Sequence, residues 1–273
     1  MSATTTIGVF DSGFGGLTVL RELLPLVPGA HCVYLGDTAR LPYGSKSQAT
    51  IARYAVESAR FLESHGAQHL VIACNTATAL AMEEIRQSVQ IPVTGVIEPV
   101  VQATRAGHPN AETLILATTA TVESHAYRAL CESHGLRPTE KACPLLVPLI
   151  EEGWIDHPVT RDVLRVYLRE ALALCSPQVV ILGCTHYPLI APLVAEVLQE
   201  LGSPAKVVDS AQATARAVAQ TLSRNGNPAP HAAAACPATC DFFATDSVEK
   251  FARLGSRFLG QPVDDVRLLD LGG

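Results

Sequence analysis

Residues 70–76 read LVIACNT and residues 180–186 read VILGCTH, and these two stretches decide how the chain can fold. Each consists of a continuous apolar run, one small residue, a cysteine and two polar residues, and a helical pattern follows. Continuous apolar runs of this length are typical of strands that are buried on both faces of a parallel sheet. The two stretches therefore predict two buried strands, each with a cysteine, Cys74 or Cys184, at its carboxyl end.

The similarity between the two parts of the chain extends beyond the cysteines. Residues 7–12 (IGVFDS) parallel residues 114–119 (LILATT), and about 24 residues after each cysteine a predicted strand ends in an acid, Glu98 or Asp209. Any two buried strands of an α/β protein look somewhat alike. The paired Cys-polar-polar endings nevertheless favour an internal duplication over chance resemblance.

Strand and helix patterns alternate along the chain. The runs that predict strands are Thr6–Phe10, Cys32–Leu35, Leu70–Ala73, Val93–Val96, Leu114–Ala117, Val179–Leu182 and Lys206–Val208. The patterns that predict helices are Leu17–Leu26, Gln48–His65, Ala77–Gln90, Val122–His134, Val159–Cys175, Leu189–Leu201, Ala211–Ser223 and Ser247–Leu259. This alternation indicates an α/β fold with mainly parallel sheets flanked by helices. We expect two pseudo-symmetric domains, residues 1–97 plus 208–273 and residues 98–207, with the active site in the cleft between them.

The composition excludes several classes of protein. With 273 residues, 48% of them hydrophobic and 17% charged, the chain can form a large core and is not disordered. The net charge of −6 and the lack of a basic stripe argue against nucleic acid as a partner. The N-terminus lacks the pattern of a signal peptide, and no apolar run reaches the roughly 18 residues of a spanning helix. We therefore expect no membrane partner and a cytoplasmic location.

The chain has eight cysteines, which in a cytosolic protein of this size are expected to be reduced. The spacing of Cys236 and Cys240 is compatible with a zinc knuckle, but no second Cys/His pair follows them. We therefore predict no metal site. Most of the cysteines lie in apolar surroundings, where the default interpretation is a small core residue.

Cys74 and Cys184 differ from the others because each follows a strand and precedes a helical pattern. Ligands of parallel sheets bind beyond the carboxyl ends of the strands. A helix N-terminus offers free N–H groups and a partial positive charge, which is expected to lower the pKa of a thiol. A single cysteine at such a place is more often a packing residue, whereas two at matching places of a repeat indicate catalysis.

Polar residues gather at the other strand ends and favour a small substrate that carries carboxylates. The glycines that follow Asp11 and Ser12 fit neither the dinucleotide fingerprint nor a P-loop, and a carboxylate-binding nest is the better interpretation. The candidate residues at the strand ends are Asp11, Ser12, Tyr43, Gly44, Asn75, Thr76, Thr118, Thr185 and His186. For the hydroxyl residues, helix capping is the alternative. For His186 it is a bond to a backbone carbonyl, and the Glu151-Glu152 pair could simply be solvated.

Taken together, these motifs resemble the glutamate racemases of the aspartate/glutamate racemase family. The resemblance rests on DSGFGGL (11–17), GDTARLPYGS (36–45), ACNTAT (73–78), CPLLVPLIEE (143–152) and LGCTHYP (182–188), and it covers nearly the whole chain. It implies that Cys74 and Cys184 act as proton acceptor and donor. One departure is that the strand before Thr118 ends in Ala117, where relatives often have glycine.

The same resemblance assigns the remaining roles. The substrate would be held by the pairs Asp11-Ser12, Tyr43-Gly44, Asn75-Thr76 and Thr185-His186. Supporting acid/base roles would fall to Asp11, His186 and one glutamate of the Glu151-Glu152 pair, with Glu151 favoured. The family also implies glutamate as the substrate, D-glutamate for peptidoglycan as the product and, more weakly, a homodimer.

No cofactor is expected. Racemisation by a cysteine on each face of Cα needs none, and none of the four lysines stands in a recognisable pyridoxal-phosphate setting. Three rival hypotheses remain open. They are a racemase for another acidic amino acid such as aspartate, a thiol hydrolase that uses Cys184 and His186, and a non-catalytic amino-acid-binding protein.

Overall fold

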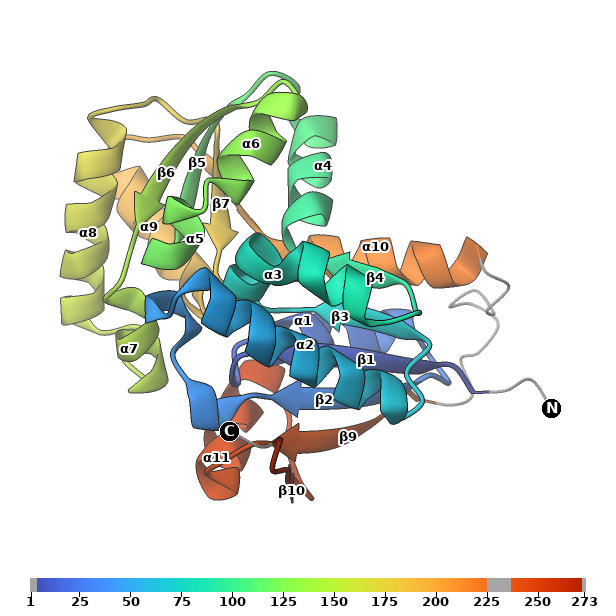
Figure 1. Cartoon of the computed structure of the whole chain (residues 1–273). Helices are drawn as coiled ribbons and strands as arrows, with labels where there is room; N and C mark the ends of the chain where they lie inside the picture. Colours follow the sequence, from blue (N-terminus) through green and yellow to red (C-terminus); the bar gives the residue numbers. More distant parts are fainter. Residues whose placement is uncertain (1–3, 225–236, 272–273) are drawn as a thin grey trace.

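The structure is a computed structural model that describes residues 4–224 and 237–271. Its strands form two sheets, and every strand pairs with its neighbours in parallel. The first sheet has the order β10-β9-β2-β1-β3-β4. Its strands are β1 (Thr6–Asp11), β2 (His31–Gly36), β3 (His69–Ile72), β4 (Val93–Gly95), β9 (Thr239–Ala244) and β10 (Arg267–Leu268). The prediction of an α/β fold with parallel sheets is confirmed (Figure 1).

The second sheet repeats the central part of the first. Its order is β6-β5-β7-β8, which corresponds strand for strand to β2-β1-β3-β4. Its strands are β5 (Glu112–Ala117), β6 (Arg137–Ala142), β7 (Val179–Gly183) and β8 (Lys206–Asp209). In this correspondence β7, which leads to Cys184, takes the place of β3, which leads to Cys74. The domain limits themselves, 1–97 plus 208–273 and 98–207, stay a prediction.

Eleven α-helices of the described residues surround the sheets (Figure 1). They are α1 (Leu17–Leu23), α2 (Gln48–Ser64), α3 (Asn75–Ser88), α4 (Ile97–Gly107), α5 (Thr119–Glu123), α6 (Ala126–Ser133), α7 (Leu146–Glu151), α8 (Pro158–Leu172), α9 (Ala191–Glu200), α10 (Ser210–Arg224) and α11 (Val248–Leu259). In the part of the chain that the structure describes, no helix is both long and apolar enough to span a membrane.

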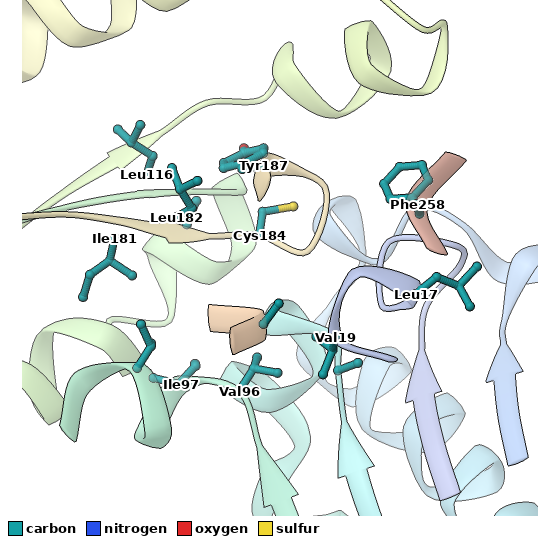
Figure 2. Close-up of a cluster of buried hydrophobic side chains, with 14 of the residues drawn as sticks. Leu17, Val19, Val96, Ile97, Leu116, Ile181, Leu182, Cys184, Tyr187 and Phe258 are labelled. Atoms are coloured by element: carbon teal, nitrogen blue, oxygen red, sulfur yellow. The ribbon is translucent and has the colours of Figure 1, made fainter. Parts of the chain in front are cut away.

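Both faces of the first sheet are buried, because successive residues of a strand point to opposite faces. In β1, Val9 packs in a cluster with Leu17 and Leu20 of α1, whereas the next residue, Phe10, packs with Ile51 of α2. The cluster on the α1 face continues into the second sheet. Figure 2 shows side chains of α1 together with Leu116, Ile181 and Cys184. A shared apolar core therefore holds the two sheets at the place where their carboxyl ends meet.

Several elements differ from the sequence prediction. Strand β4 ends at Gly95, and Glu98 lies exposed in the first turn of α4. The prediction that this strand ends in an acid is therefore wrong. The helix predicted for Val122–His134 is split into α5 and α6, because His125 adopts a left-handed conformation with φ of 55°. The helix predicted from Leu189 starts as a 3-10 turn, Tyr187–Ile190, before α9.

Candidate active site

A cavity of about 690 Å³ lies at the carboxyl ends of the strands and is lined by residues of both sheets' loops. It brings together most of the residues that the sequence singled out. Those that line it are Ser12, Tyr43, Gly44, Cys74, Asn75, Thr76, Thr118, Glu151, Glu152, Cys184, Thr185 and His186. Its volume is within the range of sites for small molecules.

Cys74 is the N-cap residue of α3, two residues after β3 ends. Its Sγ accepts a hydrogen bond from the backbone N–H of Ala77 at 3.4 Å and donates one to the hydroxyl of Ser12 at 3.4 Å. The expectation that the helix start lowers the pKa of this thiol is wrong. Burial raises the pKa of Cys74 to about 12, the carboxylate of Asp11 acts in the same direction, and the hydrogen bonds do not outweigh them.

Asp11, at the end of β1, does not line the cavity but is buried beside it. Its Oδ2 accepts a hydrogen bond from the N–H of Gly13 at 2.9 Å, and its Oδ1 is buried without a partner among the described residues. Burial raises the pKa of this carboxyl, while the charge of His186 opposes the rise. The carboxyl of Asp11 lies close enough to Cys74 to help raise the pKa of that thiol, and its substrate-binding role stays a prediction.

Cys184 directly follows β7 and belongs to a second polar group. Contrary to expectation it does not precede an α-helix, since α9 begins only at Ala191. The Nδ1 atom of His186 lies 3.9 Å from Sγ of Cys184, and its Nε2 lies 3.1 Å from Oε1 of Glu151. Burial opposes a charge on His186, but the bonds to Cys184 and Glu151 raise its pKa to about 10.

Both contacts therefore favour the charged imidazolium form of His186, which is held between a sulfur and a carboxylate. The ring edge of Phe258 in α11, with centroids 5.0 Å apart, packs against it. The sequence left open which of the two glutamates belongs to the site. Both line the cavity, but among the described residues only Glu151 is hydrogen-bonded to His186.

Three threonine hydroxyls meet between the halves of the site. Oγ1 of Thr76, after β3, lies 3.1 Å from that of Thr118 and 3.2 Å from that of Thr121, both after β5. Thr118 also caps α5, since its Oγ1 accepts from the N–H of Thr121 at 3.4 Å. For Thr118 the capping alternative is thus correct, and it coexists with a place in the cavity wall.

The loop after β2 places Tyr43 and Gly44 in the cavity wall. The hydroxyl of Tyr43 donates to Oδ2 of the buried Asp37 at 2.5 Å, and the guanidinium of Arg40 binds the same carboxylate at 2.8 Å. The hydroxyl of Tyr43 is thereby occupied by Asp37, while the residue still lines the cavity. Gly44, next in the chain, faces Thr118, and a Cβ there would lie 3.4 Å from Thr118 Cβ.

Sequence reasoning missed two lysines of the cavity lining, Lys46 and Lys250. Lys46 lies at the end of the Tyr43 loop, and Lys250 lies in α11, far from every motif of the site. Composition alone offered one hint, because a site for carboxylates is expected to attract cations and the chain has only four lysines.

No group of three or more potential metal-binding side chains occurs in residues 4–224 and 237–271. Cys236, one half of the zinc-knuckle alternative, lies outside the described residues. Cys240 lies in β9, opposite Cys32 in the strand register with the neighbouring β2.

The chain is similar to known proteins over most of its length. The Asp/Glu/hydantoin racemase family matches residues 7–218. A glutamate racemase of Koribacter versatilis is 51% identical, with 98% of each chain covered.

Two solved structures are similar over 98% of both chains. They are a glutamate racemase of Thermus thermophilus in complex with β-chloro-D-alanine (39% identity, TM-score 0.84) and one of Francisella tularensis in complex with D-glutamate (32% identity, TM-score 0.87).

Proposed function

We propose that this chain, which belongs to the Asp/Glu/hydantoin racemase family, interconverts L- and D-glutamate. Its two cysteines would act as acid and base. The observation that carries the proposal is the placement of Cys74 and Cys184. They follow corresponding strands of two similarly ordered sheets and line one cavity. A substrate bound there has one sulfur on each side, which is what proton exchange between the two faces of Cα requires.

The surroundings of the two sulfurs differ in a way that suits opposite protonation states. The ring of His186 lies 3.9 Å from the sulfur of Cys184 and is placed to exchange a proton with that sulfur. Burial and the nearby carboxylate of Asp11 favour a neutral thiol at Cys74. In one direction the Cys184 thiolate removes the α-proton, and the Cys74 thiol delivers its own proton to the opposite face. The reverse direction starts with the proton on the other sulfur.

The reaction passes through a state with negative charge at Cα and on the α-carboxylate. Donors already in place around the carboxylate lower the free energy of that state without an added cofactor. The side chains of Asn75, Thr76 and Thr185 are the candidates, because they are buried and line the cavity. Ser12, which accepts the Cys74 hydrogen bond, is placed to help direct that thiol.

Glutamate is the proposed substrate because the relatives are glutamate racemases and the structure of one of them is a complex with D-glutamate. The product would serve peptidoglycan synthesis in the cytoplasm. Aspartate, which is one methylene shorter, is the substrate to compare. A thiol hydrolase leaves Cys74 without a role, and so does a binding protein without catalysis.

The test is to incubate the reduced protein with L-glutamate in D2O, without added cofactor, and to follow optical rotation and deuterium at Cα. Loss of rotation with deuterium in the D-enantiomer supports the proposal. Cys74→Ala and Cys184→Ala should each abolish turnover, although partial proton exchange from one face can survive. Near-normal racemisation by either variant would overturn the two-cysteine mechanism, and faster turnover of aspartate would overturn the substrate assignment.

A further inference from the structure

Tyr127 of α6 is a fully buried tyrosine that contacts both catalytic loops. Its hydroxyl donates a hydrogen bond of 2.7 Å to Oδ1 of Asn75, the residue after Cys74. Its ring lies against Gly183, the residue before Cys184, since a Cβ at Gly183 would come within 3.1 Å of Tyr127 Cε2. Tyr127 therefore spans the two strand ends whose cysteines face the cavity.

In the structure the hydroxyl of Tyr127 holds the Oδ1 end of the Asn75 amide, which leaves the NH2 end on the other side. A side-chain amide has one acceptor end and one donor end, and the two ends are nearly the same in shape. A tyrosine hydroxyl that donates to Oδ1 holds the acceptor end and turns the NH2 group the other way. The Nδ2 of Asn75 is buried and has no partner among the described residues, and Asn75 lines the cavity.

A buried donor without a partner is uncommon in a folded protein and needs an explanation. A ligand carboxylate in the cavity supplies one, because it accepts hydrogen bonds from the NH2 group. The opposite orientation would present Oδ1 to the carboxylate, and two acceptors repel each other. The orientation of one amide thus decides between attraction and repulsion of the substrate.

We propose that Tyr127 is a positioning residue for substrate binding, which holds the Asn75 amide with its N–H groups toward the substrate carboxylate. This inference rests on the proposed function. Tyr127 itself does not line the cavity and acts only through Asn75.

The experiment compares Tyr127→Phe, Asn75→Ala and the double variant by KM and kcat for both glutamate enantiomers. Tyr127→Phe removes one oxygen atom and keeps the ring on Gly183. Loss of one hydrogen bond to a charged group corresponds to a factor of about 10 to 150 in KM, and we expect Tyr127→Phe, which leaves Asn75 in place, to fall near the lower end. Because the effect passes through Asn75, adding Tyr127→Phe to Asn75→Ala should change KM by less than about twofold.

The control is Tyr167→Phe in α8, which also removes a tyrosine hydroxyl, one that accepts from the N–H of Leu145 away from Asn75. It should leave KM unchanged. An unchanged KM in Tyr127→Phe, or an equal rise in KM with and without Asn75, would overturn the proposal and leave Tyr127 a packing residue. Wild-type racemisation tests the proposed function separately. If the wild type binds glutamate without turning it over, the Kd of each variant gives the same comparison.

Discussion

The Nε2 atom of His186 lies 3.1 Å from Oε1 of Glu151, and this contact connects the turn after β7 to the end of α7. On the other side of the ring, Nδ1 of His186 lies 3.9 Å from the sulfur of Cys184. The carboxylate, the imidazolium and the sulfur therefore form a row that ends in the cavity. Glu151 stabilises the charged form of His186, which lies next to the sulfur of Cys184.

Glu151→Gln should lower the pKa of His186 from its value of about 10, since one of the groups that raise it loses its charge. The imidazolium is charged below this pKa, so a lower pKa moves the loss of activity to lower pH. We expect the alkaline limb of the kcat/KM profile to shift down by about one pH unit or more, with kcat reduced about tenfold or more.

The matched control is Glu152→Gln, which removes a carboxylate from the same cavity without touching His186. Its alkaline limb should coincide with that of the wild type. Equal shifts in the two variants would mean that the general field of the cavity, and not the contact with Glu151, maintains the imidazolium.

The two catalytic sulfurs should differ in reactivity before any substrate binds. Cys74 is 5% exposed and Cys184 is 6% exposed, so access does not separate them. Burial and Asp11 keep Cys74 in the thiol form, whereas Cys184 lies beside an imidazolium. Only the thiolate is alkylated readily. Iodoacetamide near neutral pH should therefore modify Cys184 at least about tenfold faster, as followed by mass spectrometry of peptides. Faster modification of Cys74 would contradict this assignment of protonation states.

Gly15 has a similarly direct link to the catalytic loop. A Cβ at this position would overlap Oγ1 of Thr185 and lie 2.5 Å from Nδ1 of His186. Gly15→Ala should displace the His186 ring and lower kcat about a hundredfold, with a smaller effect on the midpoint of thermal unfolding. Gly107→Ala is the control, because no atom lies within 4 Å of a Cβ there, and it should leave kcat unchanged. If Gly15→Ala retains full activity, the loop is more adaptable than its packing indicates.

A site residue could be predicted from the sequence where its position depends only on the local strand pattern. Cys74 and Cys184 were visible because they follow apolar runs, and the end of a strand in a parallel sheet is a fixed place. The thiol pKa of Cys74 was predicted in the wrong direction, because the sequence shows a helix start but not the burial that outweighs it.

Contacts between distant segments were out of reach of the sequence. The bond from Tyr127 to Asn75 and the place of Lys250 in the cavity wall depend on how α6 and α11 pack. In the fold, the strands at the centre of both sheets were predicted, whereas β6, β9 and β10 were not. The edge strand β6 reads RPTEKA and has no apolar run. Strand β9 lies in the C-terminal part of the chain, which has no counterpart in the apparent duplication.

His69 in β3 should make stability depend on pH in a defined window. Burial lowers the pKa of His69 to about 4, from an ordinary value of 6.5. Between these values the unfolded chain binds a proton that the folded chain does not, so the free energy of unfolding rises with pH. The contribution of this histidine approaches about 3 kcal/mol over the window.

The measurement compares the wild type with His69→Gln by urea unfolding at several pH values. The variant also alters the bond of 2.9 Å between His69 Nε2 and Thr94, so its stability alone decides nothing. The difference between the two proteins should change by about 3 kcal/mol from mildly acidic to neutral pH. A constant difference would show that His69 is protonated in the folded protein as well.

Lys46 and Lys250 should attract the substrate into the cavity. Both line it, and neither forms an ion pair with a carboxylate among the described residues. The Nζ of Lys46 contacts the carbonyl oxygen of Pro42 at 3.4 Å, and that of Lys250 lies 5.6 Å from the centroid of the Phe14 ring. The chain as a whole carries a charge of −6, so its net charge repels an anionic substrate, and cations in the cavity wall offset that repulsion locally.

Lys250→Gln should therefore lower kcat/KM for glutamate about two- to fivefold at low ionic strength, through KM, and should weaken the dependence of kcat/KM on salt. Lys206→Gln, at the exposed start of β8, removes the same charge from the whole protein but not from the cavity. Its effect on both quantities should be smaller, because Lys206 does not line the cavity. At about 0.1 M salt, where screening limits such attraction to about 10 Å, it should have no effect. Equal losses in the two variants would mean that net charge matters and that the place of Lys250 does not. A loss in kcat at saturating substrate, with normal salt dependence, would instead assign Lys250 to the chemical step.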